Sequence, residues 1–391
     1  SSWWVNLFGH CNPRINAALR DQLDKLEHVM LAGFTHEPVI ELSERLGKLA
    51  PAGLGHCFYG SDGASAVEIA LKMSFHNWRN SGKPEKTGFV SLQNSYHGET
   101  IGALSVTDVA LFKDTYAPLL RQTAQVPTPD WRYAEAGESH EAFALRCAAA
   151  LEVHLAEHGT QTAALILEPL VQGAAGMGMY HPVYLKRARE ICDRHQVHLI
   201  ADEIAVGFGR TGTMFACEQA GISPDFLCLS KGITGGYLPL SVAMTSDAVY
   251  GAFYDEDVTR GFLHSHSYTS NALACRAALA TLDIFEQDGV IEANRIKAAN
   301  MNRSIKPLAD HPRVRNLRNT CMIWAFEVDG VERDFSRRFY EEALARELLL
   351  RPIGNTVYFM PPYVVGTDEW ALLVERTLAT LDATMTGASA A

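Results

Sequence analysis

The sequence predicts an α/β fold with a large domain built on a mainly parallel sheet, followed by a smaller α+β C-terminal domain. Three observations lead to this prediction. Short apolar runs alternate with helical patterns, the clearest runs each end at a polar or charged residue, and the pattern changes near residue 285. Alternating strands and helices favour a parallel sheet, whose buried strands are continuous apolar runs. We therefore expect a large domain over residues 1–285 and a small domain over residues 286–391.

Three apolar runs are the predicted core strands of the large domain. They are Ala163–Leu167, Val197–Ala201 and Phe226–Leu229. Glu168 follows the first run, Asp202 follows the second, and Lys231 lies two residues beyond the third. Ligands of open α/β sheets bind at the carboxyl ends of the strands. The pattern therefore predicts that Asp202 and Lys231 lie at the active-site edge.

The segments between and after these runs are predicted from helical spacing and turn residues. In the large domain we expect helices over Ala64–Trp78 and through Leu185, Ala188 and Cys192, and a surface loop over Pro127–His140. In the small domain we expect a helix over Phe335–Leu350, an extended stretch over Val357–Met360 and a frayed tail over Thr386–Ala391.

Composition limits the classes of function. With 34 Lys and Arg against 45 Asp and Glu, the net charge is −11, and no basic run is present, so nucleic acid and anionic membranes are not expected partners. The eight cysteines are scattered and form no C-x-x-C pair, and no metal-ligand spacing occurs. No apolar run reaches the roughly 20 residues that span a bilayer. We expect a cytoplasmic protein without a structural metal. Because the chain begins inside the aromatic stretch Ser1–Trp4, we also expect that an N-terminal segment is missing.

A small-residue turn, Ser61–Ser65, precedes the predicted helix at Ala64. Free N–H groups and the helix dipole make such a turn a candidate phosphate site. On this feature alone, an ordinary helix N-cap with a glycine turn explains the residues better.

Asp202 and Lys231 form the second candidate constellation, 29 residues apart at consecutive strand ends. A desolvated lysine is an amine nucleophile, and a buried carboxylate would pair with a protonated pyridine nitrogen. An Asp–Lys ion pair at the sheet edge is an equal alternative. Gly207–Gly212 also matches G-x-G-x-x-G, which leaves a nicotinamide-dependent oxidoreductase as a distant alternative. Its context is poor, because the residues between Asp202 and Gly207 separate the glycines from the strand.

The order of these residues resembles the class III aminotransferases of pyridoxal-phosphate fold type I. The likeness rests on Asp202-Glu203-Ile204, Gly207–Gly212 and Leu229–Gly236. Within the class, the chain is similar to the adenosylmethionine–8-amino-7-oxononanoate aminotransferases of biotin biosynthesis. That likeness rests on Ser1–Trp4, Phe34–Pro38, Tyr96–Thr100, Met179–Pro182, Arg351-Pro352 and Met360–Tyr363. It implies amino transfer from S-adenosylmethionine to 8-amino-7-oxononanoate, giving 7,8-diaminononanoate. A class III transaminase that uses lysine or another ω-amine donor is the alternative.

The resemblance also implies roles in binding pyridoxal 5′-phosphate. Lys231 would hold the cofactor as a Schiff base and move the proton, and Asp202 would pair with the pyridinium nitrogen. Gly63 and Ala64 would bind the phosphate through backbone N–H groups, and Tyr96 would stack on the ring. Ala64 stands where the family often has Ser or Thr, which removes a side-chain donor.

Substrate and partner roles follow from the same resemblance. Substrate-binding residues would be Trp3, which walls an apolar tunnel, Arg351, which binds the keto acid's carboxylate, and Tyr96, Lys231 and Ser265. The family is homodimeric with shared active sites, so Ser265, His266 and Ser267 would reach across the interface, the last two to the partner's phosphate. This stretch is often Gly-Pro-Thr in the family, and Glu99 stands where Asp is common.

Overall fold

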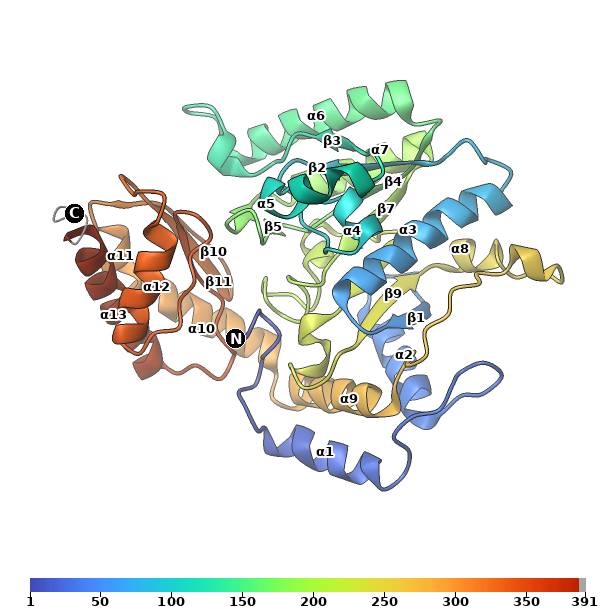
Figure 1. The fold of residues 1–391 in the computed structure, drawn as a ribbon, viewed down its shortest axis with the longest axis horizontal. Coiled ribbons are helices and arrows are strands. Elements are labelled where there is room, and N and C mark those ends of the chain that lie inside the picture. Colours follow the sequence, from blue (N-terminus) through green and yellow to red (C-terminus); the bar gives the residue numbers. More distant parts are fainter. Residues whose placement is uncertain (387–391) are drawn as a thin grey trace.

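The computed structural model describes residues 1–386. Its centre is a seven-stranded sheet with strand order β1-β9-β8-β7-β4-β2-β3, in which β9 alone runs antiparallel to its neighbours (Figure 1). The strands are β1 (His56–Gly60), β9 (Ser241–Thr245), β8 (Phe226–Leu229), β7 (His198–Asp202), β4 (Thr162–Leu167), β2 (Gly88–Leu92) and β3 (Ala124–Val126). The predicted strand runs are β4, β7 and β8, which lie side by side and parallel, as the pattern predicted.

Helices cover both faces of this sheet. Along β4, β7 and β8, Leu165, Leu199 and Leu227 pack in one core cluster, while Ile166, Ile200 and Cys228 pack with α3 in a second. Successive strand residues point to opposite faces, so a sheet buried on both sides needs apolar residues at every position. The main helices here are α1 (Pro13–Leu23), α2 (Glu37–Leu49), α3 (Gly63–Asn80), α6 (His140–His158), α7 (Val183–His195) and α9 (Ala272–Gln287).

Shorter elements connect these layers. They are the helices α4 (Ile101–Ser105), α5 (Ala110–Lys113) and α8 (Asp247–Gly251), the hairpin β5 (Val171–Gln172) and β6 (Gly178–Met179), and 3₁₀ turns at Asp114–Leu119, Trp131–Tyr133, Ala216–Ala220, Lys231–Thr234 and Val258–Arg260.

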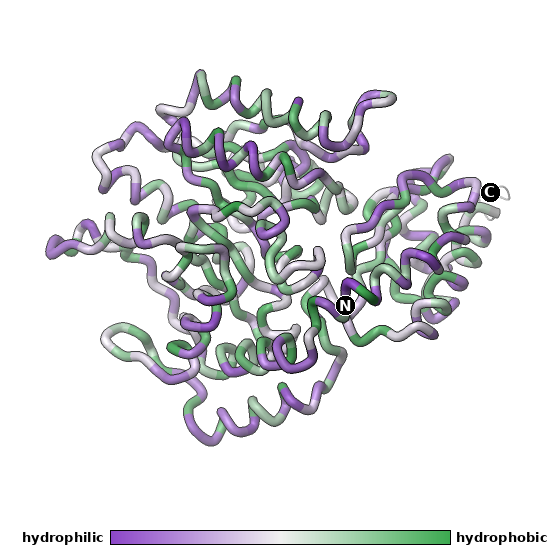
Figure 2. The backbone as a smooth tube through the Cα atoms, turned by 180° about the vertical axis from the view of Figure 1, so that it is seen from behind, coloured by the Kyte–Doolittle hydropathy of each residue, from purple (hydrophilic) through white to green (hydrophobic). Residues whose placement is uncertain are grey.

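A second, antiparallel sheet of three strands, β10-β11-β12, lies apart from the first. Trp324 of β11 and Trp370 of α13 are buried with ring centroids 4.6 Å apart, which joins the sheet to its helices. Figure 2 shows hydrophobic residues concentrated in the inner strands and alternating with hydrophilic ones along the outer helices. The elements are β10 (Val314–Thr320), β11 (Ile323–Val328), β12 (Thr356–Phe359), α10 (Val290–Ser304), α11 (Lys306–Ala309), α12 (Phe335–Ala345) and α13 (Thr367–Thr386).

The structure confirms the predicted fold class and refines several elements. The helix predicted over Phe335–Leu350 ends at Ala345, and Glu347 has φ 58°, in the left-handed region that ends helices. The loop predicted over Pro127–His140 contains one 3₁₀ turn, and Ser139 caps the helix that begins at His140. Of the tail predicted to fray, residues 387–391 lie outside the described part of the chain. Helix α9 crosses the expected domain boundary at residue 285, and the three-stranded sheet follows it.

Candidate active site

A cavity of about 260 Å³ lies at the carboxyl ends of β4, β7 and β8. It is lined by Trp4, Asp62–Ala64, Tyr96–Glu99, Glu168, Asp202, Ile204–Val206 and Lys231. The three strand ends and the Ser61–Ser65 turn therefore converge on one cavity, although they lie up to 170 residues apart in sequence.

Asp202 is the last residue of β7 and is buried. Its Oδ2 lies 2.7 Å from Nδ1 of His97, and its Oδ1 accepts a hydrogen bond of 3.1 Å from the backbone N–H of Ile204. A buried carboxylate is costly unless it is hydrogen-bonded, and these two contacts hold one oxygen each. Each oxygen can still accept a further hydrogen bond from a ligand in the cavity.

Lys231 begins the 3₁₀ turn after β8 and has φ 44°, a strained left-handed conformation for a lysine. Its Nζ lies 4.6 Å from the ring centroid of Trp4. Burial lowers the pKa of the Lys231 amine, while the negative charges of Asp202 and Glu168 act in the opposite direction. A lower pKa makes the uncharged, nucleophilic amine more abundant. Among the ion pairs of residues 1–386, none joins Lys231 to Asp202, so the alternative of a direct Asp–Lys pair is not observed.

The turn at Asp62 brings the N-terminus of α3 to the cavity. Asp62 caps the helix, since its Oδ1 accepts a 2.9 Å hydrogen bond from the N–H of Ser65. The first helical N–H groups have no partner within a helix, and here they belong to Gly63 and Ala64, which line the cavity. Gly98 packs against this turn, and a Cβ on it would lie 2.7 Å from the Cβ of Ala64. The turn is thus an N-cap, as one of the two explanations of Ser61–Ser65 predicts, and its position at the cavity leaves it a candidate anion site.

Glu168 connects two walls of the cavity. Its Oε1 accepts a 3.0 Å hydrogen bond from the N–H of Tyr96, and its Oε2 accepts one of 2.9 Å from the N–H of Gly173. Gly173 in turn lies against the Trp4 ring, because a Cβ on it would be 3.0 Å from that ring. Burial raises the pKa of Glu168 to about 7. Tyr96 also donates its hydroxyl to Glu99 at 2.9 Å.

The structure places the two tryptophans of the N-terminal stretch differently. Trp4 lines the cavity and donates its Nε1–H to the hydroxyl of Tyr358 at 3.3 Å, whereas Trp3 is 66% exposed and is absent from the lining. Arg351 is exposed and outside the lining, with its guanidinium 5.0 Å from the ring of Tyr340. Arg351 is nevertheless close enough to lower the pKa of Tyr358, which burial raises.

The stretch Ser265–Ser267 also lies outside this cavity, in the loop before α9. His266 forms a hydrogen bond through Nε2 with the hydroxyl of Ser61, so it touches the Ser61–Ser65 turn of its own chain. The carbonyl of Ser267 lies 2.9 Å from Nε2 of His28, and Ser265 is exposed.

The Gly207–Gly212 segment does not form a nucleotide-binding turn. It lies in a loop beyond β7, and the next helical element is the 3₁₀ turn that begins at Ala216. Arg210 within it is 1% exposed and donates to the carbonyls of Pro361 at 2.5 Å and of Trp4 and Asn6 at 3.3 Å. The segment thus has a structural role.

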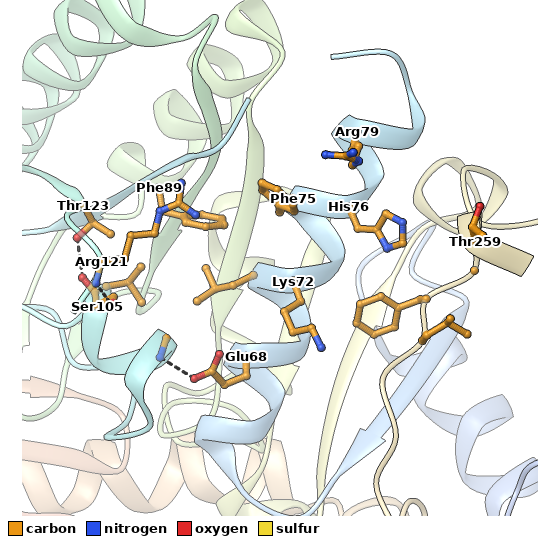
Figure 3. Close-up of a pocket in the computed structure, with 16 residues that line it drawn as sticks. Glu68, Lys72, Phe75, His76, Arg79, Phe89, Ser105, Arg121, Thr123 and Thr259 are labelled. Atoms are coloured by element: carbon orange, nitrogen blue, oxygen red, sulfur yellow. Dashed lines mark hydrogen bonds between the residues drawn. The ribbon is translucent and has the colours of Figure 1, made fainter. Parts of the chain in front are cut away.

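A larger cavity of about 600 Å³ lies along α3, from Glu68 to Arg79, and none of the predicted site residues lines it. Figure 3 shows Lys72, Phe75, His76 and Arg79 projecting from one helix, with Arg121 across the opening. In residues 1–386, no group of His, Cys, Asp and Glu could hold a metal ion. No helix in that part of the chain is long and apolar enough to cross a membrane.

Comparison with known proteins assigns the family. The family Aminotransferase class-III matches residues 1–381. The chain belongs to the class III aminotransferases. A curated relative, the adenosylmethionine-8-amino-7-oxononanoate aminotransferase of Helicobacter pylori, is 48% identical over 98% of this chain and 87% of its own length.

Solved structures of this family share the fold of the chain. The adenosylmethionine-8-amino-7-oxononanoate aminotransferase of Methanocaldococcus jannaschii superposes with a TM-score of 0.90 at 34% identity, covering 97% of this chain and 87% of that one. An amine transaminase from an uncultivated Pseudomonas species, solved in its PLP-bound form, gives 0.90 at 33% identity and covers 98% and 89%. These likenesses confirm pyridoxal-phosphate fold type I.

Class III aminotransferases use pyridoxal 5′-phosphate, and the cavity of this aminotransferase fits that group. The buried carboxylate of Asp202 has unused lone pairs that suit the ring nitrogen, and the buried amine of Lys231, with its lowered pKa, suits the aldehyde. The first N–H groups of α3 suit the phosphate. Sequence reasoning did not single out His97, Trp4 or the contacts of Glu168. His97 and Trp4 each adjoin a residue that it did select, Tyr96 and Trp3.

Proposed function

We propose that this chain transfers the amino group of S-adenosylmethionine to 8-amino-7-oxononanoate, giving 7,8-diaminononanoate in biotin biosynthesis. The observation that carries the proposal is 48% identity over 98% of the chain to the Helicobacter pylori enzyme of that name. The convergence of Asp202 and Lys231 on one cavity supports the chemistry.

The cofactor roles follow from the contacts in the cavity. When bound, pyridoxal phosphate supplies an electron sink for the substrate's α carbon. Lys231 Nζ would hold the aldehyde carbon and then carry the proton between substrate and cofactor. Asp202 would accept a hydrogen bond from the protonated ring nitrogen. Gly63 and Ala64 would donate N–H groups to the phosphate, and Tyr96 would cover a ring face.

For the substrate we propose an apolar wall and a carboxylate site. Trp4 has the better support as the wall, since its ring lies over Nζ of Lys231 and Trp3 is exposed. Trp3 would contact the substrate at the entrance of the cavity. Arg351 is near enough to Tyr358, the partner of Trp4, to lower its pKa, and we propose that a substrate extending past Trp4 meets its guanidinium. Arginine binds carboxylates through two parallel hydrogen bonds.

A homodimer would complete the site. Ser265, His266 and Ser267 lie in a loop whose neighbours Leu263 and Tyr268 are 75% and 66% exposed. Burial of those apolar side chains against a second copy would bring the loop to the partner's phosphate site. We also propose that residues 1–285 and 286–391 act as the two domains, since the second sheet lies wholly in the latter.

A transaminase that uses lysine or another ω-amine is the second candidate. It is favoured by the TM-score of 0.90 with the Pseudomonas amine transaminase, because the fold alone does not select the donor.

Half-reactions test the two candidates. The purified protein, loaded with pyridoxal phosphate, is mixed separately with S-adenosylmethionine, lysine and a simple ω-amine, and the visible absorbance of the cofactor is followed. 8-Amino-7-oxononanoate is then added and the product is identified by mass. We expect the absorbance change with S-adenosylmethionine and a product of the mass of 7,8-diaminononanoate. A response to lysine or the ω-amine with none to S-adenosylmethionine would contradict the donor assignment.

A further inference from the structure

A turn beside Trp4, residues 173–177, joins β5 to β6 and has no part in the proposed function. Its first residue, Gly173, lies against the Trp4 ring, since a Cβ there would be 3.0 Å from that ring. We propose that Arg132 and Arg318 are positioning residues, which bind the carbonyls of this turn and so fix the Trp4 ring where it meets the substrate. This inference rests on the proposed function to the extent that Trp4 forms the apolar wall of the substrate site.

Three consecutive carbonyls of the turn accept hydrogen bonds from two guanidinium groups. Arg132 donates from Nη2 to the carbonyl of Ala175 at 2.9 Å. Arg318 donates from Nη2 to the carbonyl of Gly176 at 2.5 Å and from Nε to that of Met177 at 2.9 Å. A guanidinium is a rigid, planar fork of donors, so the carbonyls that it binds are fixed relative to one another. The turn can therefore shift only if several of these bonds break together.

Two carboxylates hold the guanidinium groups in place. Oδ2 of Asp130 accepts hydrogen bonds from Nε and Nη2 of Arg132 at 2.8 and 2.5 Å. Oε1 of Glu327 lies 2.9 Å from Nη1 of Arg132 and 2.7 Å from Nη2 of Arg318, so this carboxylate joins the two arginines. The four side chains are only 2% to 12% exposed. Removing one member of such a buried network leaves an uncompensated charge, and the network therefore resists rearrangement.

The network connects the small sheet to the turn. Arg318 and Glu327 belong to β10 and β11, whereas Arg132 lies in the 3₁₀ turn that precedes α6. Strand β12 also approaches the turn, because a Cβ on Gly176 would lie 2.7 Å from Oγ1 of Thr356. Gly176 has φ 77°, in the left-handed region, so both its backbone and its surroundings favour glycine. The position of the small sheet therefore determines the position of the turn.

The turn transmits this position to Trp4. The N–H of Met177 donates to the carbonyl of Gly173 at 3.1 Å, which connects the end bound by the arginines to the end at the cavity. The N–H of Gly173 donates to Glu168 at 2.9 Å, and the Trp4 ring lies against the same residue. Trp4 also donates to the hydroxyl of Tyr358 in β12. The small sheet thus acts on Trp4 by two routes, and the arginines carry one of them.

Arg318→Lys is the variant that tests this role. Lysine keeps a positive charge beside Glu327, but a single ammonium group cannot reproduce the fork that binds two carbonyls. Arg189→Lys is the matched control, because Arg189 is also largely buried and lies 2.7 Å from Asp225. Asp225 directly precedes β8, at the edge of the sheet opposite the cavity. Both variants should lower Tm, and only Arg318→Lys should affect the substrate.

Steady-state kinetics with 8-amino-7-oxononanoate, at a saturating donor concentration, give the first measurement. A displaced ring keeps part of its contact with the substrate, so we expect Arg318→Lys to raise KM about 10-fold and to leave kcat within about twofold. Gly173→Ala should raise KM in the same way with both arginines intact, because its Cβ would lie 3.0 Å from the Trp4 ring. Arg189→Lys should keep the KM of wild type.

Hydrogen–deuterium exchange of the apoproteins gives a second measurement that needs no substrate. Peptides spanning residues 1–8 and 173–178 should exchange faster in Arg318→Lys than in wild type, and Arg189→Lys should leave both unchanged. If Arg318→Lys does not fold, Arg132→Lys takes its place with the same expected outcomes, since it releases the carbonyl of Ala175.

Unchanged exchange in both peptides would overturn the proposal, and so would faster exchange with the KM of wild type. A rise in KM as large in Arg189→Lys as in Arg318→Lys would also overturn it, because the effect would then be one of general stability. A wild-type protein that does not aminate 8-amino-7-oxononanoate would contradict the proposed function instead. The exchange comparison would still decide whether the arginines position the turn and Trp4.

Discussion

The adjacent tryptophans Trp3 and Trp4 offer a matched test of which side chain contacts the substrate. One face of an indole covers about 100 Å². At about 25 cal/mol per Å², its contact with an apolar substrate chain contributes about 2.5 kcal/mol, or about 70-fold in kcat/KM. Because Trp4 lines the cavity and Trp3 is 66% exposed, we expect Trp4→Ala to lose about this factor. Trp3→Ala, as a surface change worth about 0.5 kcal/mol, should lose about twofold.

The assay is kcat/KM for 8-amino-7-oxononanoate at a saturating donor concentration, with the visible spectrum of the cofactor as a check that its binding is intact. Trp4→Phe serves as an intermediate, since a smaller ring keeps part of the face and loses the hydrogen bond to Tyr358. A larger loss for Trp3→Ala than for Trp4→Ala would refute this reasoning and support the sequence-based assignment of Trp3.

Four further outcomes are expected. Lys231→Ala should abolish turnover. After borohydride treatment, gel filtration should remove the cofactor from this variant, whereas wild type should retain it. Retention of the cofactor by the variant would exclude Lys231 as the attachment residue. Burial raises the pKa of Glu168 to about 7 in the folded state, so the free energy of unfolding should fall as pH rises from 4.5 to 7. In Glu168→Gln this fall should be smaller by about 3 kcal/mol, because the residue no longer titrates. A variant with the pH profile of wild type would contradict this reasoning. Glu327→Gln should lower Tm by several degrees, because it leaves the buried Arg318, 2.7 Å away, without its countercharge; an unchanged Tm would show that the pair is not stabilising. Leu263→Glu should shift a dimer toward monomer in light scattering, and an unaffected dimer would exclude this loop from the interface.

Local patterns were enough to predict that Asp202 and Lys231 lie at one edge of the sheet. Apolar runs ending at Asp202 and just before Lys231 identify buried parallel strands, and parallel strands in one sheet end at one edge. The helix start at Gly63 is likewise a local signal, because Asp62 caps it. These features depend on short-range chemistry, which a sequence displays directly.

Contacts between distant segments were not predictable in this way. His97 and Asp202 lie 105 residues apart, and no periodicity relates them. The choice between Trp3 and Trp4 depends on a turn in which Ser2, Trp3 and Trp4 have φ of 50°, 55° and 71°. In such an irregular turn, neither helical nor strand spacing determines which side chain points inward.

The Gly207–Gly212 segment connects the N-terminal stretch that contains Trp4 to the small sheet. Gly209 and Gly212 have φ of 86° and 98°, conformations that favour glycine, and they place Arg210 in the interior between them. Its guanidinium binds the carbonyls of Trp4 and Asn6 on one side and of Pro361, just beyond β12, on the other. A lysine there could not reach three carbonyls in two directions with a single ammonium group. The segment that suggests nucleotide binding in the sequence therefore holds the backbone of Trp4, whose ring centroid lies 4.6 Å from Nζ of Lys231.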